Sequence, residues 1–203
     1  MITKPELRKK FTNQLAIWHW VNLLLIALIL LTVLMVKTIF NSRANIPVVQ
    51  AALEKKGVVI DNEQARAVTK LYSKQLWDWH VYFGYFLAAF FVYRIILEFF
   101  QPEDSKFILR FKQAKAYFKG GQDTIKDARH HLGVKVAYIL FYLDLFLMVS
   151  TGLFIKFSSD YPKLKPAKEF LKEVHNVGMY IMLSFIVAHL IGLLIDERKK
   201  KTV

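Results

Sequence analysis

The residues whose chemistry stands out are two histidines near the end of the chain, His175 and His189. Both lie in an apolar stretch, 170–195, that is long enough to form one helix across a membrane. They are 14 positions apart, so at about 100° and 1.5 Å per residue they share one face of that helix, roughly 21 Å apart. An imidazole in hydrocarbon is costly unless it has a partner, which makes such a residue a functional candidate. The spacing therefore predicts ligands for two stacked prosthetic groups.

The elements that must position these ligands are membrane helices. The chain has 203 residues, 55% of them hydrophobic, and its apolar residues form four blocks at 15–36, 77–100, 132–157 and 170–195. Runs of about 20 mostly apolar residues match the hydrocarbon thickness of a bilayer. The sequence predicts an all-α fold, an up-down-up-down four-helix transmembrane bundle that forms a single membrane domain over 1–203.

Basic residues lie almost wholly between these blocks and give the chain a net charge of +13. This distribution favours binding to lipid headgroups over nucleic-acid binding, for which there is no basic soluble domain. The first block is too long for a signal peptide and has no small-x-small cleavage site after it, so we expect it to be retained. Basic residues before it and at 198–201 place both termini on the inner, cytoplasmic side.

Cysteine is absent from the chain. Without thiolates the chain cannot form disulfides, ligate an iron–sulfur cluster or attach haem through Cys-x-x-Cys-His. Any haem is therefore expected to be bound non-covalently.

Four of the six histidines sort by depth into two pairs. With the N-terminus inside, the first block runs outward and the second runs inward, which places His19 near the inner surface and His80 near the outer one. The last block also runs inward, so His175 is outside and His189 is inside. Because facing imidazoles across a helix bundle can ligate the iron of a protoporphyrin, depth matching predicts two haem sites, His19 with His189 and His80 with His175.

Other residues beside the histidines have two interpretations each. Gly84, Gly178 and Gly192 would give a flat macrocycle room, or they are helix-packing contacts, in which membrane helices are rich. Arg94 would contact a haem propionate or snorkel to the inner surface. Asp144 lies near mid-membrane with no obvious partner in the sequence.

The mouth of the third block carries His130 and His131. One interpretation is a surface role. The other is a hydrogen bond to a quinone headgroup, or proton delivery there, because histidine titrates near neutral pH.

The connections between the blocks also have predicted structure. In the outer loop, 38–75, a short helix is expected between Pro47 and Gly57, and Asp61 is expected to cap a second helix that continues into the next block. This loop is either a lid over the bundle or a binding surface. In the inner loop, 101–130, an apolar stripe along 107–118 predicts an interfacial amphipathic helix on the bilayer.

With these residues in place, the chain resembles the bacterial cytochrome b561 family, which includes the cytochrome b subunits of nickel–iron hydrogenases and related formate dehydrogenases. The resemblance covers the four apolar blocks, and the spacing of His175 and His189 is its most specific element. Its other motifs are Trp18-His19-Trp20, Trp79-His80 through Gly84 and Arg94, His131-Leu132-Gly133 and Thr151-Gly152-Leu153.

The resemblance implies two haem b groups in a bacterial inner membrane, with the inner iron held by His19 and His189 and the outer iron by His80 and His175. It also implies a quinone site near the inner haem. Dehydrogenase-type members place the quinone against an Asn-x-Gly, and at that position this chain has His131 and Gly133.

The predicted function is electron transfer between an outer-face (periplasmic) redox subunit or cytochrome and the quinone pool, as the membrane anchor of a hydrogenase- or dehydrogenase-like complex. Electrons would pass from the outer to the inner haem and reduce quinone near the cytoplasmic side. One alternative is a free-standing quinone oxidoreductase. Another is a histidine-lined metal-ion transporter without haem. Assembly into a homo-oligomer stays open.

Overall fold

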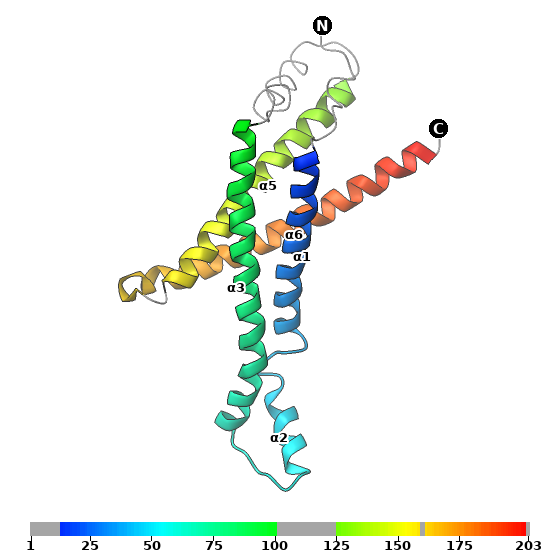
Figure 1. Ribbon diagram of the computed structural model, residues 1–203. Helices are drawn as coiled ribbons and strands as arrows, with labels where there is room; N and C mark the ends of the chain where they lie inside the picture. The colour runs from blue at the N-terminus through cyan, green and yellow to red at the C-terminus, as the bar shows by residue number, and fades with distance from the viewer. Residues whose placement is uncertain (1–12, 101–124, 159–160, 202–203) are drawn as a thin grey trace. The chain divides into compact units, whose positions relative to one another are not determined.

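A computed structural model describes residues 13–100, 125–158 and 161–201 (Figure 1). All regular elements in these ranges are helical, which confirms the predicted all-α class. The predicted amphipathic helix along 107–118 lies outside the described residues. The elements are α1 (Asn13–Lys37), α2 (Ile46–Glu54), α3 (Asn62–Phe100), α5 (Ile125–Phe157), the 3-10 turn η3 (Pro162–Leu164) and α6 (Lys165–Lys201).

Four of these helices are long and apolar enough to cross a membrane, and each contains one of the predicted apolar blocks. A helix satisfies its backbone hydrogen bonds internally, as a span through hydrocarbon requires. Large apolar side chains stay exposed along these helices, among them Leu24, Phe86 and Leu194. Lipid is the natural surrounding for such faces. The candidate spans are Asn13–Lys37, Asn62–Phe100, Val136–Phe157 and Lys165–Ile195.

Helix α3 begins where the sequence predicts, at a reciprocal pair of hydrogen bonds. The Gln64 amide donates to Asp61 Oδ1 at 2.7 Å, and the Asp61 amide donates to Gln64 Oε1 at 3.0 Å. This capping box satisfies two backbone donors at the helix start. The helix then continues for 39 residues, or about 58 Å, well beyond the roughly 30 Å hydrocarbon core.

Helix α2 is the predicted short helix of the outer loop, with Pro47 in its first turn. After the helix, Gly57 has a φ of +76°, a left-handed conformation that glycine adopts without steric cost. The Gly57 amide bonds the Glu54 carbonyl at 2.9 Å, and the Val58 amide bonds the Leu53 carbonyl at 3.0 Å. These two bonds form a Schellman ending, which satisfies the last carbonyls of the helix.

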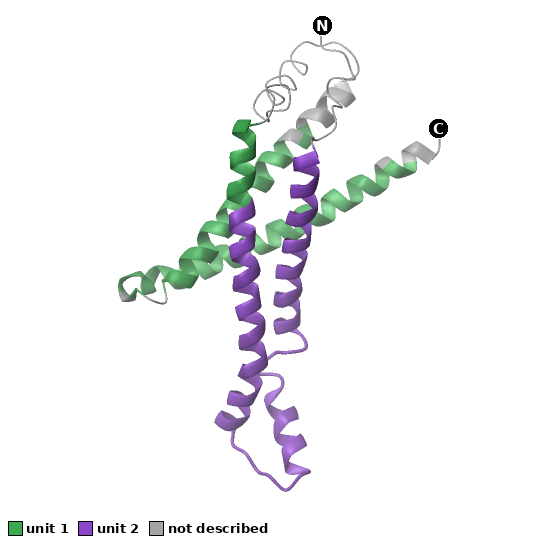
Figure 2. Ribbon diagram, in the orientation of Figure 1, with its two compact units in different colours: residues 1–12, 91–203 green, residues 13–90 purple. Residues whose placement is uncertain are grey.

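The chain divides into two compact units (Figure 2). Unit 2 is Asn13–Phe90, and unit 1 joins Met1–Thr12 to Phe91–Val203. In unit 2, the Trp18 indole N–H of α1 donates to the Phe90 carbonyl of α3 at 2.9 Å. Thr32, later in α1, contacts His80, earlier in α3, so these two helices run antiparallel.

In unit 1, α5 and α6 also run antiparallel. The rings of Phe141 and Phe185 lie 5.0 Å apart, centre to centre. Further along α5, Thr151 contacts His175 near the start of α6. The last turns of α3 belong to this unit too, where Phe91 packs on Phe146.

The capping box gives the first prediction. Asp61→Ala should cost the start of α3 about 1 kcal/mol, because one backbone donor loses its acceptor. Hydrogen–deuterium exchange of the first-turn amides should then accelerate about fivefold. Asp61→Asn keeps a side-chain acceptor and is the control. Equal exchange in Asp61→Ala and the parent protein would contradict the cap.

Candidate functional site

In unit 2, a threonine of α1 fixes the ring of His80 on α3. His80 Nδ1 lies 3.1 Å from Thr32 Oγ1, and the Thr32 hydroxyl donates to the Ile29 carbonyl at 2.6 Å. A hydroxyl has one proton, and here that proton forms the hydrogen bond to the Ile29 carbonyl. The Thr32 oxygen therefore accepts a hydrogen bond from the Nδ1–H of His80. The lone pair of the imidazole is then on Nε2. Trp77 lies edge-on to the same ring at 5.2 Å.

In unit 1, a threonine of α5 does the same for His175 on α6. His175 Nδ1 lies 2.8 Å from Thr151 Oγ1, while the Thr151 hydroxyl donates to the Leu147 carbonyl at 2.6 Å. The ring also forms a hydrogen bond with the backbone of Met148. It lies so close to Gly152 that a Cβ there would be 3.2 Å from Cε1.

Both arrangements suit a metal-binding imidazole. Histidines that ligate metals usually donate their other ring N–H to a fixed acceptor, which sets the tautomer and the orientation of the ring. His80 and His175 therefore fit the chemistry of haem ligands.

Thr32 was not predicted from the sequence, and Thr151 and Gly152 entered only as parts of a family motif. A signal for Thr32 was present, because it is the only hydroxyl residue between positions 15 and 36.

The other two predicted ligands are more exposed and have aromatic neighbours. His19 on α1 lies edge-on to Trp20, with ring centres 5.8 Å apart. His189 on α6 is parallel to Phe185 within 5°, at 6.3 Å. Each of these histidine rings therefore has an aromatic neighbour on its own helix.

Each unit carries histidines at two levels. In unit 2, His80 contacts Thr32, which is 13 residues after His19 on α1, or about 20 Å along the axis. In unit 1, His175 and His189 are 14 residues, or about 21 Å, apart on α6. The two separations are nearly equal.

Arg94 on α3 is held inside unit 1. Its Nε donates to the Tyr142 hydroxyl at 3.0 Å, and its Nη1 pairs with Glu98 Oε2 at 3.0 Å. The residue is only 9% exposed, so its side chain is not extended along the surface. A guanidinium has five N–H donors, of which these bonds use two. Contact with a propionate stays a prediction.

The predicted glycines have different surroundings. At Gly178 on α6, an added Cβ would lie 2.7 Å from the Met148 sulfur and 3.2 Å from Asp144 Oδ1, both on α5. Gly178 therefore permits close approach of α5 and α6. By contrast, an added Cβ at Gly84 or Gly192 would meet no atom of the described residues within 4 Å, apart from nearby backbone of its own helix.

Asp144 lies at this same contact between α5 and α6. It is buried, and neither of its carboxyl oxygens has a hydrogen-bond partner within the described ranges. A buried polar group without a partner is unusual, because its loss of hydration is not compensated.

The predicted quinone residues lie near the start of α5. His130 and His131 are in its helical backbone, although their side chains fall outside the described parts. A Cβ at Gly133 would meet nothing within 4 Å among the side chains that the structure describes. Among the described residues, no group of three or more His, Asp or Glu side chains could hold a metal ion.

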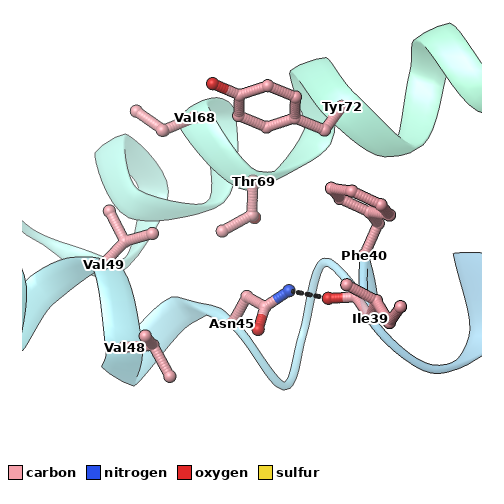
Figure 3. Close-up of a pocket in the computed structure, with 8 residues that line it drawn as sticks. All are labelled: Ile39, Phe40, Asn45, Val48, Val49, Val68, Thr69 and Tyr72. Atoms are coloured by element: carbon pink, nitrogen blue, oxygen red, sulfur yellow. Dashed lines mark hydrogen bonds between the residues drawn. The ribbon is translucent and has the colours of Figure 1, made fainter. Parts of the chain in front are cut away.

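The outer loop of unit 2 encloses an apolar pocket of about 210 Å³ (Figure 3). Its wall is braced by the Asn45 side-chain amide, which donates to the Ile39 carbonyl at 2.8 Å. Several lining side chains are also exposed, including Val48 and Tyr72. The lining residues are Ile39, Phe40, Asn45, Val48, Val49, Val68, Thr69 and Tyr72.

Membrane-length helices with histidines at two levels, two of them anchored through Nδ1, are typical of a transmembrane cytochrome that binds haem. The family model for prokaryotic cytochrome b561 matches residues 10–203, and the chain belongs to this family. It is therefore a bacterial membrane b-type cytochrome that binds haem b and takes part in electron transfer. No curated protein and no solved structure gives a significant match.

The contact at Gly178 gives the second prediction. Gly178→Val should weaken the packing of α5 on α6 by about 1–3 kcal/mol, because the larger side chain must displace Met148 and Asp144. Thermal unfolding in detergent should show a lower midpoint. Ser184→Val, at an exposed position of α6, is the control. A Gly178→Val midpoint equal to that of the control would show that the contact is not tight.

Proposed function

We propose that this protein is a diheme cytochrome that transfers electrons between a redox partner on the outer face and the quinone pool. The observation that carries the proposal is the matched pair of threonine–histidine hydrogen bonds, one in each unit, at the two histidines that depth matching pairs. Family membership supports the electron-transfer role. The near-equal spacing of the two histidine levels supports two haem sites rather than one.

In this proposal, His80 and His175 hold the outer iron, and His19 and His189 hold the inner iron. Bound haem b supplies one-electron iron chemistry. The protein supplies the ligands, an apolar surrounding and the hydrogen bonds that orient the rings.

Other residues would support the haem groups from within the helices. Gly84 and Gly192 would leave space beside the ligands, and no side chain of the described residues lies within 4 Å of an added Cβ at either position. Arg94, already oriented by Tyr142 and Glu98, would place its guanidinium toward an inner propionate.

Quinone would bind near the inner end, at the start of α5. His131 would form a hydrogen bond with the quinone headgroup and pass protons from the cytoplasmic side, and Gly133 would leave room for the ring. Protons taken up from inside during reduction by electrons from outside would make the transfer electrogenic.

The protein would act as the membrane anchor of a larger oxidoreductase, with the outer loop as the docking surface. The exposed apolar side chains around the pocket of α2 and α3 support this role, because such patches mark interaction sites. The partner would be a hydrogenase- or dehydrogenase-like subunit. Purification from native membranes should recover this subunit in stoichiometric amount.

The ligand assignment is tested by haem content. His189→Ala should remove one of two haem groups per chain and abolish quinone reduction, because the inner iron loses a ligand. His175→Ala should remove the other group. The measurement is the dithionite-reduced spectrum, quantified per chain from its b-type α-band, with Ser184→Ala as the control on α6. Two haem groups remaining in either histidine variant would refute the assignment.

The quinone site is tested separately. His131→Leu should lower quinone turnover while haem content stays at the parent level, because the variant loses the hydrogen bond to the headgroup and the proton path but no iron ligand. Turnover is measured with a reduced artificial donor and a soluble quinone. His130→Leu, at the neighbouring position, is the comparison. Parent-like turnover in His131→Leu would rule out the contact.

A further inference from the structure

The two threonines at the outer histidines share an arrangement that ligation alone does not require. Thr32 of α1 and Thr151 of α5 are 6% and 5% exposed. Each donates its hydroxyl proton to a carbonyl three or four residues earlier on its own helix, at 2.6 Å in both cases. Each then faces the Nδ1 of a histidine on the neighbouring helix.

We propose that Thr32 and Thr151 are positioning residues for His80 and His175, and that each hydroxyl oxygen lowers the reduction potential of the haem that its histidine ligates. The proposal rests on the proposed ligation by His80 and His175. It adds a tuning role that the ligand assignment does not contain.

Toward the imidazole, each threonine hydroxyl can act only as a hydrogen-bond acceptor. A threonine hydroxyl in a helix can turn its proton toward a carbonyl of the preceding turn. Once it does so, its oxygen can only accept from the imidazole, and the histidine is fixed with its proton on Nδ1. Both threonines are buried, so water is not available to replace a lost bond. Because His175 also bonds the Met148 backbone, the shift in Thr151→Val should be the smaller of the two.

A threonine hydroxyl also donates to a carbonyl of the preceding turn where no histidine faces it. The Thr38 hydroxyl donates to the Leu34 carbonyl at 2.7 Å, and this residue is exposed beyond the end of α1. Donation to a carbonyl of the preceding turn is therefore ordinary for a threonine in this chain. What distinguishes Thr32 and Thr151 is burial together with a facing imidazole nitrogen.

The hydrogen bond at Nδ1 affects the reduction potential of the iron through the basicity of the imidazole. An acceptor at Nδ1 raises the basicity of a ligating imidazole, and a more basic ligand stabilises oxidised iron. A neutral hydroxyl oxygen is a weaker acceptor than a carboxylate, so its effect is moderate. Removing it should make the iron easier to reduce, which raises the midpoint potential.

The test uses Thr32→Val and Thr151→Val in the full-length, haem-loaded protein, titrated by optical potentiometry. In each variant one wave should shift upward, and it should be the wave that disappears when the facing histidine is replaced, in His80→Ala for Thr32 and in His175→Ala for Thr151. Haem affinity at the altered site should fall about tenfold, the lower end of the range for losing such a partner.

Serine and control variants separate tuning from packing. Thr32→Ser and Thr151→Ser keep the hydroxyl and lose the threonine methyl group. They should have the parent potential if the hydroxyl sets it, and an altered one if the methyl packing does. Thr38→Val removes an equivalent hydroxyl with no facing histidine and should leave both waves unchanged.

The outcomes are distinct for the two proposals. Unshifted waves in both valine variants would overturn the tuning role while leaving the ligands in place. Retention of both haem groups in His80→Ala and His175→Ala would instead overturn the ligand assignment on which this inference rests.

Discussion

The structure depends on one constraint, that an imidazole inside hydrocarbon must find its hydrogen-bond partner within the protein. Water is not at hand to supply it, and an unsatisfied polar group in that setting is expensive. Thr32 and Thr151 meet this need from helices adjacent to His80 and His175. Because a hydrogen bond demands a specific distance and direction, each one also fixes how its two helices are rotated about their axes.

Close helix packing accompanies this constraint in unit 1. Association of helices in lipid is not driven by the hydrophobic effect between them, so backbones must approach closely to gain van der Waals contact. Gly152 lies against the ring of His175, and Gly178 lies against Met148 and Asp144. The buried carboxyl of Asp144 thus lies where two helices meet rather than against lipid.

Features set by local sequence were predictable, whereas features set by helix rotation were not. The capping box at Asp61 and the glycine ending of α2 involve residues only a few positions apart, so the sequence alone specifies them. The separation of His175 and His189 follows from helix geometry. By contrast, the roles of Thr151 and Gly178 depend on which neighbouring side chain faces them. Spacing cannot tell whether a glycine makes room for a cofactor or for another helix.

The unbroken course of α3 has a mechanical consequence. No proline or glycine occurs between Asn62 and Phe83, and kinks in helices usually arise at such residues. Tyr72 of the outer pocket and His80 are therefore fixed on one stiff rod, about 12 Å apart along its axis. A rotation of the outer segment about the helix axis therefore also turns the side chain of His80. The outer pocket residues and this histidine are mechanically linked through one continuous helix.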